Sequence, residues 1–167
     1  EEDFVDNYNV KFYFTRGGYF KKITLTSLRG ADEQKLKDGD EIAQVTDGEN
    51  ISELLFVSDK QRIYRTKASD FDTCKASALG DYIPAKLGFE KDEKAIAMDV
   101  DTKFDSKHFV IYIFENGKGV KLPLSLYETK TPRKKLVAAY SAASPIVAAF
   151  FVSENEDIIL VHSQNTA

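Results

Sequence analysis

The stretch that decides the fold is FYFTRGGYFKKITL at 12–25, because its hydrophobic frame returns three more times along the chain. The later copies read LFVSDKQRIYRT at 55–66, YIFENGKGVKLPL at 112–124 and FFVSENEDIILV at 150–161. An alignment without gaps makes two sets of positions equivalent: Phe14, Val57, Phe114 and Val152, and Phe20, Ile63, Val120 and Ile158. The intervals are 43, 57 and 38 residues. Repeats of this length, built of short strands and tight turns, indicate the blades of a propeller.

The segments between these repeats also favour an all-β domain. LKDGDEIAQV at 36–45 resembles FEKDEKAIAMDV at 89–100, and in both an acidic turn leads into an apolar strand. Each unit then holds about four short strands, the size of a blade. We therefore expect a single propeller-like domain over 1–167, with about four visible four-stranded blades and repeat hairpins near 10–25, 54–66, 109–124 and 148–161.

Helix signals are few. We expect one helical turn at 32–37, before Gly39, and another at 132–140, where Pro132 would occupy the first helical position. Neither segment carries a sustained apolar stripe, so helices should contribute little to the core.

Composition narrows the function. A chain of 167 residues, 43% hydrophobic, can bury a core, and no run approaches the roughly 18 apolar residues of a membrane span. The start lacks Met and is acidic, so we expect a boundary within a longer protein and no signal peptide. Cys74 is the only cysteine, which excludes an internal disulfide and predicts a half-buried thiol. A net charge of −4 mildly disfavours nucleic acid, although the distribution of charge decides what a surface attracts.

The sequence offers no set of residues for catalysis or metal binding. His108 and His162 each flank an apolar strand, without further ligands at metal-binding spacing. Three aspartates within 99–105 resemble the start of a calcium loop, but Lys103 and Phe104 stand where an EF-hand needs Asp or Asn and then Gly. We expect no catalytic residue, no metal site and no cofactor in this domain.

Positive charge gathers after the turns of three repeats, whereas the fourth turn, 154–157, is acidic. The cations are Arg16, Lys21, Lys22 and Arg29; Lys60, Arg62, Arg65 and Lys67; and Lys118, Lys121, Lys130, Arg133, Lys134 and Lys135. A band of spaced cations suits the phosphate backbone of a duplex, because phosphate neutralisation releases counterions. The same residues can instead protect exposed sheet edges from pairing with other chains. Charge alone leaves both interpretations open, and the recurrence at matching positions favours binding.

Three long phrases resemble the C-terminal domain of the A protein of bacterial type IIA DNA topoisomerases, the gyrase A and topoisomerase IV A group of Firmicutes. They are YFKKITLTSLRGADEQKLKDGDEI at 19–42, TKASDFDTCKASALGDYIPAKLGF at 66–89 and ENGKGVKLPLSLYETKTPRKKLVAAYSAASPIV at 115–147. The resemblance implies a β-pinwheel, a propeller-like disc whose basic outer rim binds and bends double-stranded DNA without reading its sequence. The residues it places on this rim are Arg16, Lys21, Lys22, Arg29, Arg62, Arg65, Lys118, Lys121, Arg133, Lys134 and Lys135.

Two departures limit the resemblance. Gyrases that wrap DNA carry a Gln-Arg-Arg-Gly-Gly-Lys-Gly box, and the matching stretch here is SLRGADE at 27–33. Only Arg29 and Gly30 match the box, and Asp32 and Glu33 oppose its charge, so chiral wrapping is not implied. The family disc has five or six blades, so four repeats predict a fragment of a larger disc.

The resemblance also implies what lies outside this domain. The nucleophilic tyrosine, the metal-binding acidic residues, ATP and Mg²⁺ belong to other parts of the full enzyme, which also contacts the topoisomerase B protein. We expect a cytoplasmic, nucleoid-associated location without membrane contact. The rival interpretation is a protein-interaction propeller that binds a peptide or partner protein, which the acidic, aromatic-rich composition favours slightly. A small enzyme on a propeller scaffold would need convergent polar groups that the sequence lacks.

Overall fold

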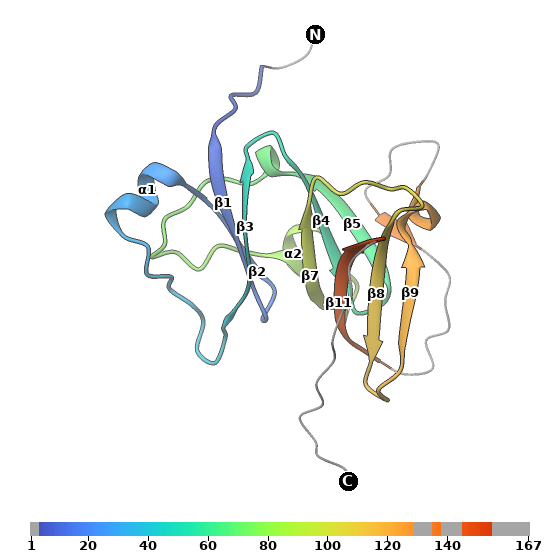
Figure 1. The fold of residues 1–167 in the computed structure, drawn as a ribbon. Coiled ribbons are helices and arrows are strands. Elements are labelled where there is room, and N and C mark those ends of the chain that lie inside the picture. Colours follow the sequence, from blue (N-terminus) through green and yellow to red (C-terminus); the bar gives the residue numbers. More distant parts are fainter. Residues whose placement is uncertain (1–3, 129–134, 138–144, 155–167) are drawn as a thin grey trace.

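The computed structural model describes residues 4–128, 135–137 and 145–154, and shows three antiparallel sheets side by side (Figure 1). Sheet 1 contains, in spatial order, β3 (Ile42–Glu49), β1 (Asn9–Thr15), β2 (Tyr19–Thr24) and β6 (Asp81–Tyr82). Sheet 2 contains β7 (Ala95–Val100), β4 (Glu53–Ser58), β5 (Arg62–Lys67) and β10 (Lys135–Val137). Sheet 3 contains β11 (Ile146–Ser153), β8 (His108–Phe114) and β9 (Gly119–Pro123). The all-β propeller-like prediction is confirmed.

Each sheet is built on one hairpin of the sequence repeat. The hairpins are β1–β2, β4–β5 and β8–β9, and their turns lie on the same side of the molecule, lower in Figure 1. The strands β3, β7 and β11 each pair with the first strand of a hairpin. The likeness between 36–45 and 89–100 therefore corresponds to two strands in equivalent places.

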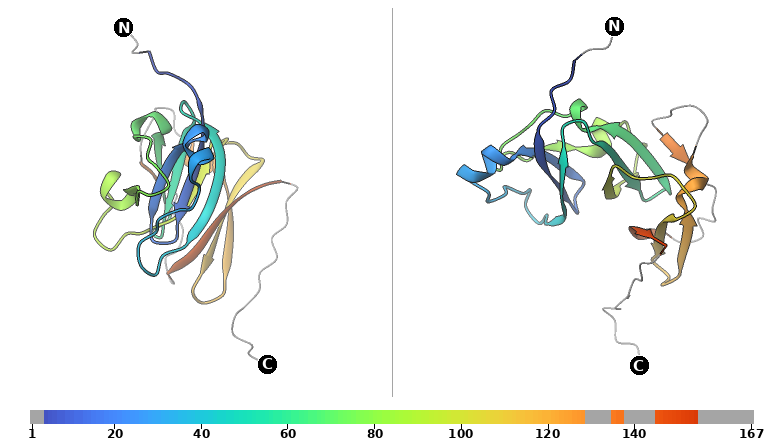
Figure 2. Two further views of the ribbon diagram at one scale, coloured as in Figure 1. Left: turned by 90° about the vertical axis from the view of Figure 1, so that its left-hand side faces the viewer. Right: turned by 45° about the horizontal axis from the view of Figure 1, so that its top comes forward.

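Sheets 1 and 2 each receive their outermost strand from the next unit of the chain. β6 follows β5 in sequence but pairs with β2, and β10 follows β9 but pairs with β5. This exchange links each sheet to its neighbour through the backbone. It also gives the three units a continuous arrangement, which the second view in Figure 2 shows from sheet 1 to sheet 3.

The core consists of apolar layers between the sheets. Phe12, Phe14 and Phe20 of sheet 1 pack with Phe56 of sheet 2 and with Phe71, all of them buried. A second layer joins sheets 2 and 3, and it contains Leu55, Val57 and Ile63 from sheet 2, Val110, Tyr112 and Phe114 from sheet 3, and Tyr127 from the turn after it. Within this layer the hydroxyls of Tyr112 and Tyr127 lie 2.5 Å apart.

The gap-free alignment of the repeat is wrong at its third copy. Phe14 pairs with Phe20 and Val57 with Ile63, but Ile113 pairs with Gly119, because the third turn is shorter. Since adjacent strand residues point to opposite faces, Phe114 packs toward sheet 2, the preceding sheet, whereas Phe14 and Val57 pack toward the following one. Ile113 is the true equivalent.

The fourth predicted hairpin, 148–161, also differs. Its first half is β11, which pairs with β8 and so occupies the place of β3 and β7 rather than that of a hairpin strand. Its second half lies outside the described residues, which form three sheets instead of the four predicted blades.

The helices are short. They are α1 (Leu25–Gly30), α2 (Ile83–Lys86) and the 3₁₀ turns η1 (Ala68–Asp70) and η2 (Leu124–Tyr127). The helical turn predicted at 32–37 is wrong, and that predicted at 132–140 is wrong over Lys135–Val137, which form β10; its other residues lie outside the described ranges. Across the described part of the chain, no helix has the length and apolar character to cross a membrane.

Candidate nucleic-acid interface

The eleven predicted rim cations fall into four groups in the structure. Arg16, Arg29, Lys118 and Lys121 are exposed; Arg62 and Arg65 are half-buried; Lys21 and Lys22 are buried. Arg133 and Lys134 lie outside the described residues, and of Lys135 the structure describes the backbone in β10.

Lys21 is a structural residue, so its assignment to an exposed rim is corrected. Its side chain is 1% exposed, and Nζ donates to Gln34 Oε1 at 3.1 Å, to the Lys35 carbonyl at 2.8 Å and to the Ala76 carbonyl at 3.0 Å. Burial lowers its pKa from the ordinary lysine value. Its three bonds hold the loop after α1 and the segment near half-buried Cys74 against β2. This contact explains why 32–37 is not helical.

Lys22 is corrected in the same way. It is 3% exposed, and its ammonium donates to Asn50 Oδ1 at 2.6 Å and to the Ala68 carbonyl at 2.9 Å. Burial lowers its pKa, and the nearby charges of Asp72 and Asp70 oppose that shift. A phosphate could reach neither lysine without opening the fold, which removes both from the candidate set.

Arg62 belongs to a buried acidic network. Its Nη1 lies 3.0 Å from Glu90 and 3.3 Å from Glu93, whose side chain is fully buried. The Tyr64 hydroxyl donates to the same Glu93 carboxylate at 2.9 Å. Burial and this carboxylate raise the pKa of Tyr64 to about 12. Burial opposes ionisation of Glu93, but hydrogen bonds from Ser58, the Glu90 backbone and Tyr64 keep its pKa below the ordinary value.

Arg65 is likewise occupied. It forms a two-bond pair with Glu53, Nε to Oε1 at 3.1 Å and Nη2 to Oε2 at 2.9 Å, and its guanidinium lies 5.2 Å from the Phe104 ring centre. Bidentate arginine–carboxylate pairs are among the stronger polar contacts in proteins. Arg62 and Arg65 therefore satisfy carboxylates of their own sheet and its connections.

The exposed cations have weak partners or none among the described residues. Arg16, at the β1–β2 turn, contacts Glu41 at 2.6 Å, but both side chains are mostly exposed, and such surface pairs contribute little. Arg29 lies in the last turn of α1. Lys118, next to the β8–β9 turn, has no carboxylate of the described chain within 4.0 Å of its ammonium.

Positive charge concentrates in one part of the chain, which repeat-based reasoning missed. Residues 103–135 contain eight lysines and arginines against three carboxylates, a net charge of +5, whereas the remaining residues sum to −9. The described members include exposed Lys103 and Lys107, which lie in the connection between β7 and β8, outside any hairpin. A running sum of charge along the sequence would have found them.

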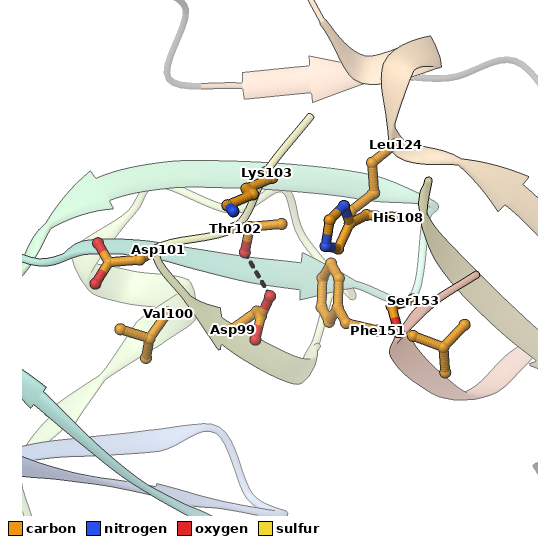
Figure 3. Close-up of a pocket in the computed structure, with 10 residues that line it drawn as sticks. Asp99, Val100, Asp101, Thr102, Lys103, His108, Leu124, Phe151 and Ser153 are labelled. Carbon is orange, nitrogen blue, oxygen red and sulfur yellow. Dashed lines mark hydrogen bonds between the residues drawn. The ribbon is translucent and has the colours of Figure 1, made fainter. Parts of the chain in front are cut away.

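A hollow of about 290 Å³ lies beside this connection, between sheets 2 and 3 (Figure 3). The Thr102 hydroxyl donates to Asp99 at 2.5 Å, and burial raises the pKa of that carboxyl. Outside the hollow, Asp105 accepts from His108 Nδ1 at 2.7 Å, and this bond lowers the pKa of Asp105. Asp99 and Asp101 line the hollow, so it does not suit phosphate, and no metal-binding group of three or more His, Cys, Asp or Glu occurs among the described residues.

Known proteins of similar sequence are topoisomerase components, although no family model matches the chain. The A protein of DNA gyrase from Streptomyces coelicolor is 25% identical over 96% of this chain. The A protein of DNA topoisomerase 4 from Staphylococcus aureus is 24% identical over 96%. The chain spans about a fifth of the length of these curated relatives.

Solved structures agree on the fold. The C-terminal domain of DNA topoisomerase IV superposes with a TM-score of 0.75 at 19% identity, covering 90% of this chain and 47% of that one. The E. coli ParC C-terminal domain gives a TM-score of 0.60 at 13% identity, covering 87% and 57%. The fold is the β-pinwheel of topoisomerase C-terminal domains. The homologues of this chain are DNA gyrase A and topoisomerase IV A, as the sequence phrases predicted.

Proposed function

We propose that this chain is a DNA-binding accessory domain of a gyrase A or topoisomerase IV A protein. It would hold a duplex on its basic rim, bend it and present it to the cleavage core of the full enzyme. The observation that carries this proposal is the separation of charge, with +5 over residues 103–135 in a chain whose total is −4.

The exposed cations support phosphate contact rather than base readout. Lys103, Lys107 and Lys118 are exposed lysines on or beside sheet 3, and lysine binds phosphate as a point charge. Contacts of this kind position a protein on DNA without carrying sequence information. Weak sequence preference and strong salt dependence follow from it.

Bending rests on where the other exposed cations lie. Arg16 and Arg29 belong to sheet 1 and the helix after it, at the opposite end of the array from the lysines of sheet 3 (Figure 1). A duplex that contacts both ends has to follow the edges of three sheets, and such deformation costs energy that the added phosphate contacts offset. Chiral wrapping is not part of the proposal, because Asp32 and Glu33 stand where the wrapping box is basic.

The remaining functions belong to other parts of the proposed full enzyme. Strand cleavage, ATP, Mg²⁺ and contact with the topoisomerase B protein lie outside this domain, and a nucleoid-associated cytoplasmic location follows from the DNA role.

The test is fluorescence anisotropy with a random-sequence duplex of about 40 base pairs. The triple variant Lys103→Glu, Lys107→Glu, Lys118→Glu should bind roughly 100-fold more weakly, from three lost contacts of about 1 kcal/mol each. The matched control is Lys75→Glu, Lys91→Glu, Lys94→Glu, three exposed lysines in the acidic part of the chain. It changes net charge equally and should lose much less affinity. Equal losses in both variants would refute a local interface.

The protein-interaction interpretation has one observation in its favour. An apolar groove of about 580 Å³ is lined by β3, β7 and β11, including Ile96 and exposed Val147. Absence of DNA binding at low salt, together with a partner retained after nuclease treatment, would favour it.

A further inference from the structure

A cation recurs at one register position in all three sheets. Lys22 lies opposite Phe12, Arg65 opposite Leu55, and Lys121 opposite Ile111. Because directly opposite residues of an antiparallel pair share a face, the three cations occupy equivalent places. The gap-free alignment hid this relation, since it matched Lys121 with Lys21.

In sheets 1 and 2 the following sheet covers this face. Phe12 and Leu55 are fully buried. Lys22 reaches Asn50, in the connection from β3 into sheet 2, and Arg65 stacks on Phe104, in the connection from β7 into sheet 3. Each cation therefore contacts the connection that leads into the next sheet.

In sheet 3 the equivalent face stays partly open. Ile111 and Phe109 are only half-buried, and Phe150, paired with Ile111, is 40% exposed. The Lys121 ammonium lies over the Phe109 ring, 4.4 Å from its centre. This surface has the apolar character and the cation of the two covered faces.

We propose that residues 155–167 cover this face as the beginning of a further sheet. β3 ends at Glu49 and β4 begins at Glu53; β7 ends at Val100 and β8 begins at His108. β11 holds the same place in sheet 3 and ends at Ser153, and the apolar run IILV follows at 158–161, a comparable distance away.

Charge supports the same occupant. The connection after β11 reads ENED at 154–157, three carboxylates in four residues. By its register, Lys121 should face this connection as Lys22 faces Asn50. Lys121 thus serves the fold, whereas Lys118 on the same hairpin remains a candidate for DNA.

The first test is amine acetylation of the full chain, followed by mass spectrometry. Lys121 should react about fivefold more slowly than Lys118, its matched control, and deletion of residues 155–167 should make the two rates similar, because local protection is lost. Equal rates in the full chain would overturn the proposal.

A thermal double-mutant cycle gives a second test that separates the occupants. Ile111→Glu should lower the Tm of the full chain but change it far less after deletion of 155–167, because interacting sites are not additive. Val45→Glu, at an exposed apolar position on β3, is the control and should have little effect in either background. Full additivity would refute the proposal. A concentration-dependent dimer that Ile111→Glu dissociates would assign the face to a second copy instead.

Discussion

Replacing Lys21 by methionine tests whether this lysine serves the fold or DNA. Methionine keeps an unbranched side chain of similar length and removes the ammonium, which leaves the carbonyls of Lys35 and Ala76 without their donor. A buried acceptor left unsatisfied costs about 1–3 kcal/mol, and relief of the ammonium's desolvation offsets part of the total. We expect a net loss of about 2–3 kcal/mol. For a domain of this size that lowers Tm by roughly 5–10 °C.

The assay is calorimetry, with DNA anisotropy measured well below the Tm of the variant. Folded Lys21→Met should bind DNA within about twofold of the parent, because a buried lysine makes no phosphate contact. An unchanged Tm combined with a large loss of DNA affinity would refute the burial argument.

The same variant has a pH signature. Burial lowers the pKa of Lys21 in the folded chain below the ordinary 10.5, so the unfolded chain binds more protons between the folded value and 10.5. Stability therefore rises with pH through that window in the parent relative to Lys21→Met. Urea denaturation of both proteins across the window measures the difference, and a fall in relative stability would contradict the assigned direction.

Three further predictions follow from individual contacts. Glu93 has a folded pKa below 4.5, so its contribution is complete above pH 4.5 and lost as pH falls through the folded value; Glu93→Gln should flatten the acid limb in urea denaturation, and a parallel limb would contradict this. Gly48→Ala should cost about 1–3 kcal/mol, because the new Cβ would lie 2.4 Å from the Phe12 ring, whereas Gly30→Ala, with no atom within 4 Å, should not destabilise; equal denaturation midpoints would refute it. Lys118→Gln should reduce the salt slope of DNA binding by about 0.9 without changing Tm, and an unchanged slope would exclude a phosphate contact.

The sequence predicted the hairpins well because their signals are local. Alternating apolar residues and the turns at Gly17–Gly18 and Asn116–Gly117 specify β1–β2 and β8–β9 without reference to the rest of the chain. The strand exchange was not predictable in this way. β6 is two residues long, and its place beside β2 depends on tertiary contacts that no short apolar pattern encodes.

The candidate site was predictable only in part. Lys21 and Lys22 follow a turn and carry charge, so repeat reasoning placed them at the surface, whereas the acceptors that bury Lys21 come from Gln34, Lys35 and Ala76, 13 to 55 residues away. Arg62 and Arg65 were misjudged for the same reason, since Glu90 and Glu93 are distant in sequence from Arg62. Lys118 was placed correctly at an exposed position because its turn is local.

The central claim is that this domain holds duplex DNA by phosphate contacts. The most direct measurement is the affinity for a random-sequence duplex at a series of salt concentrations. If about five phosphates are neutralised, log K should fall with log salt at a slope of about −4.5, with little difference between sequences. A slope near zero, or no binding at low salt, would contradict the account.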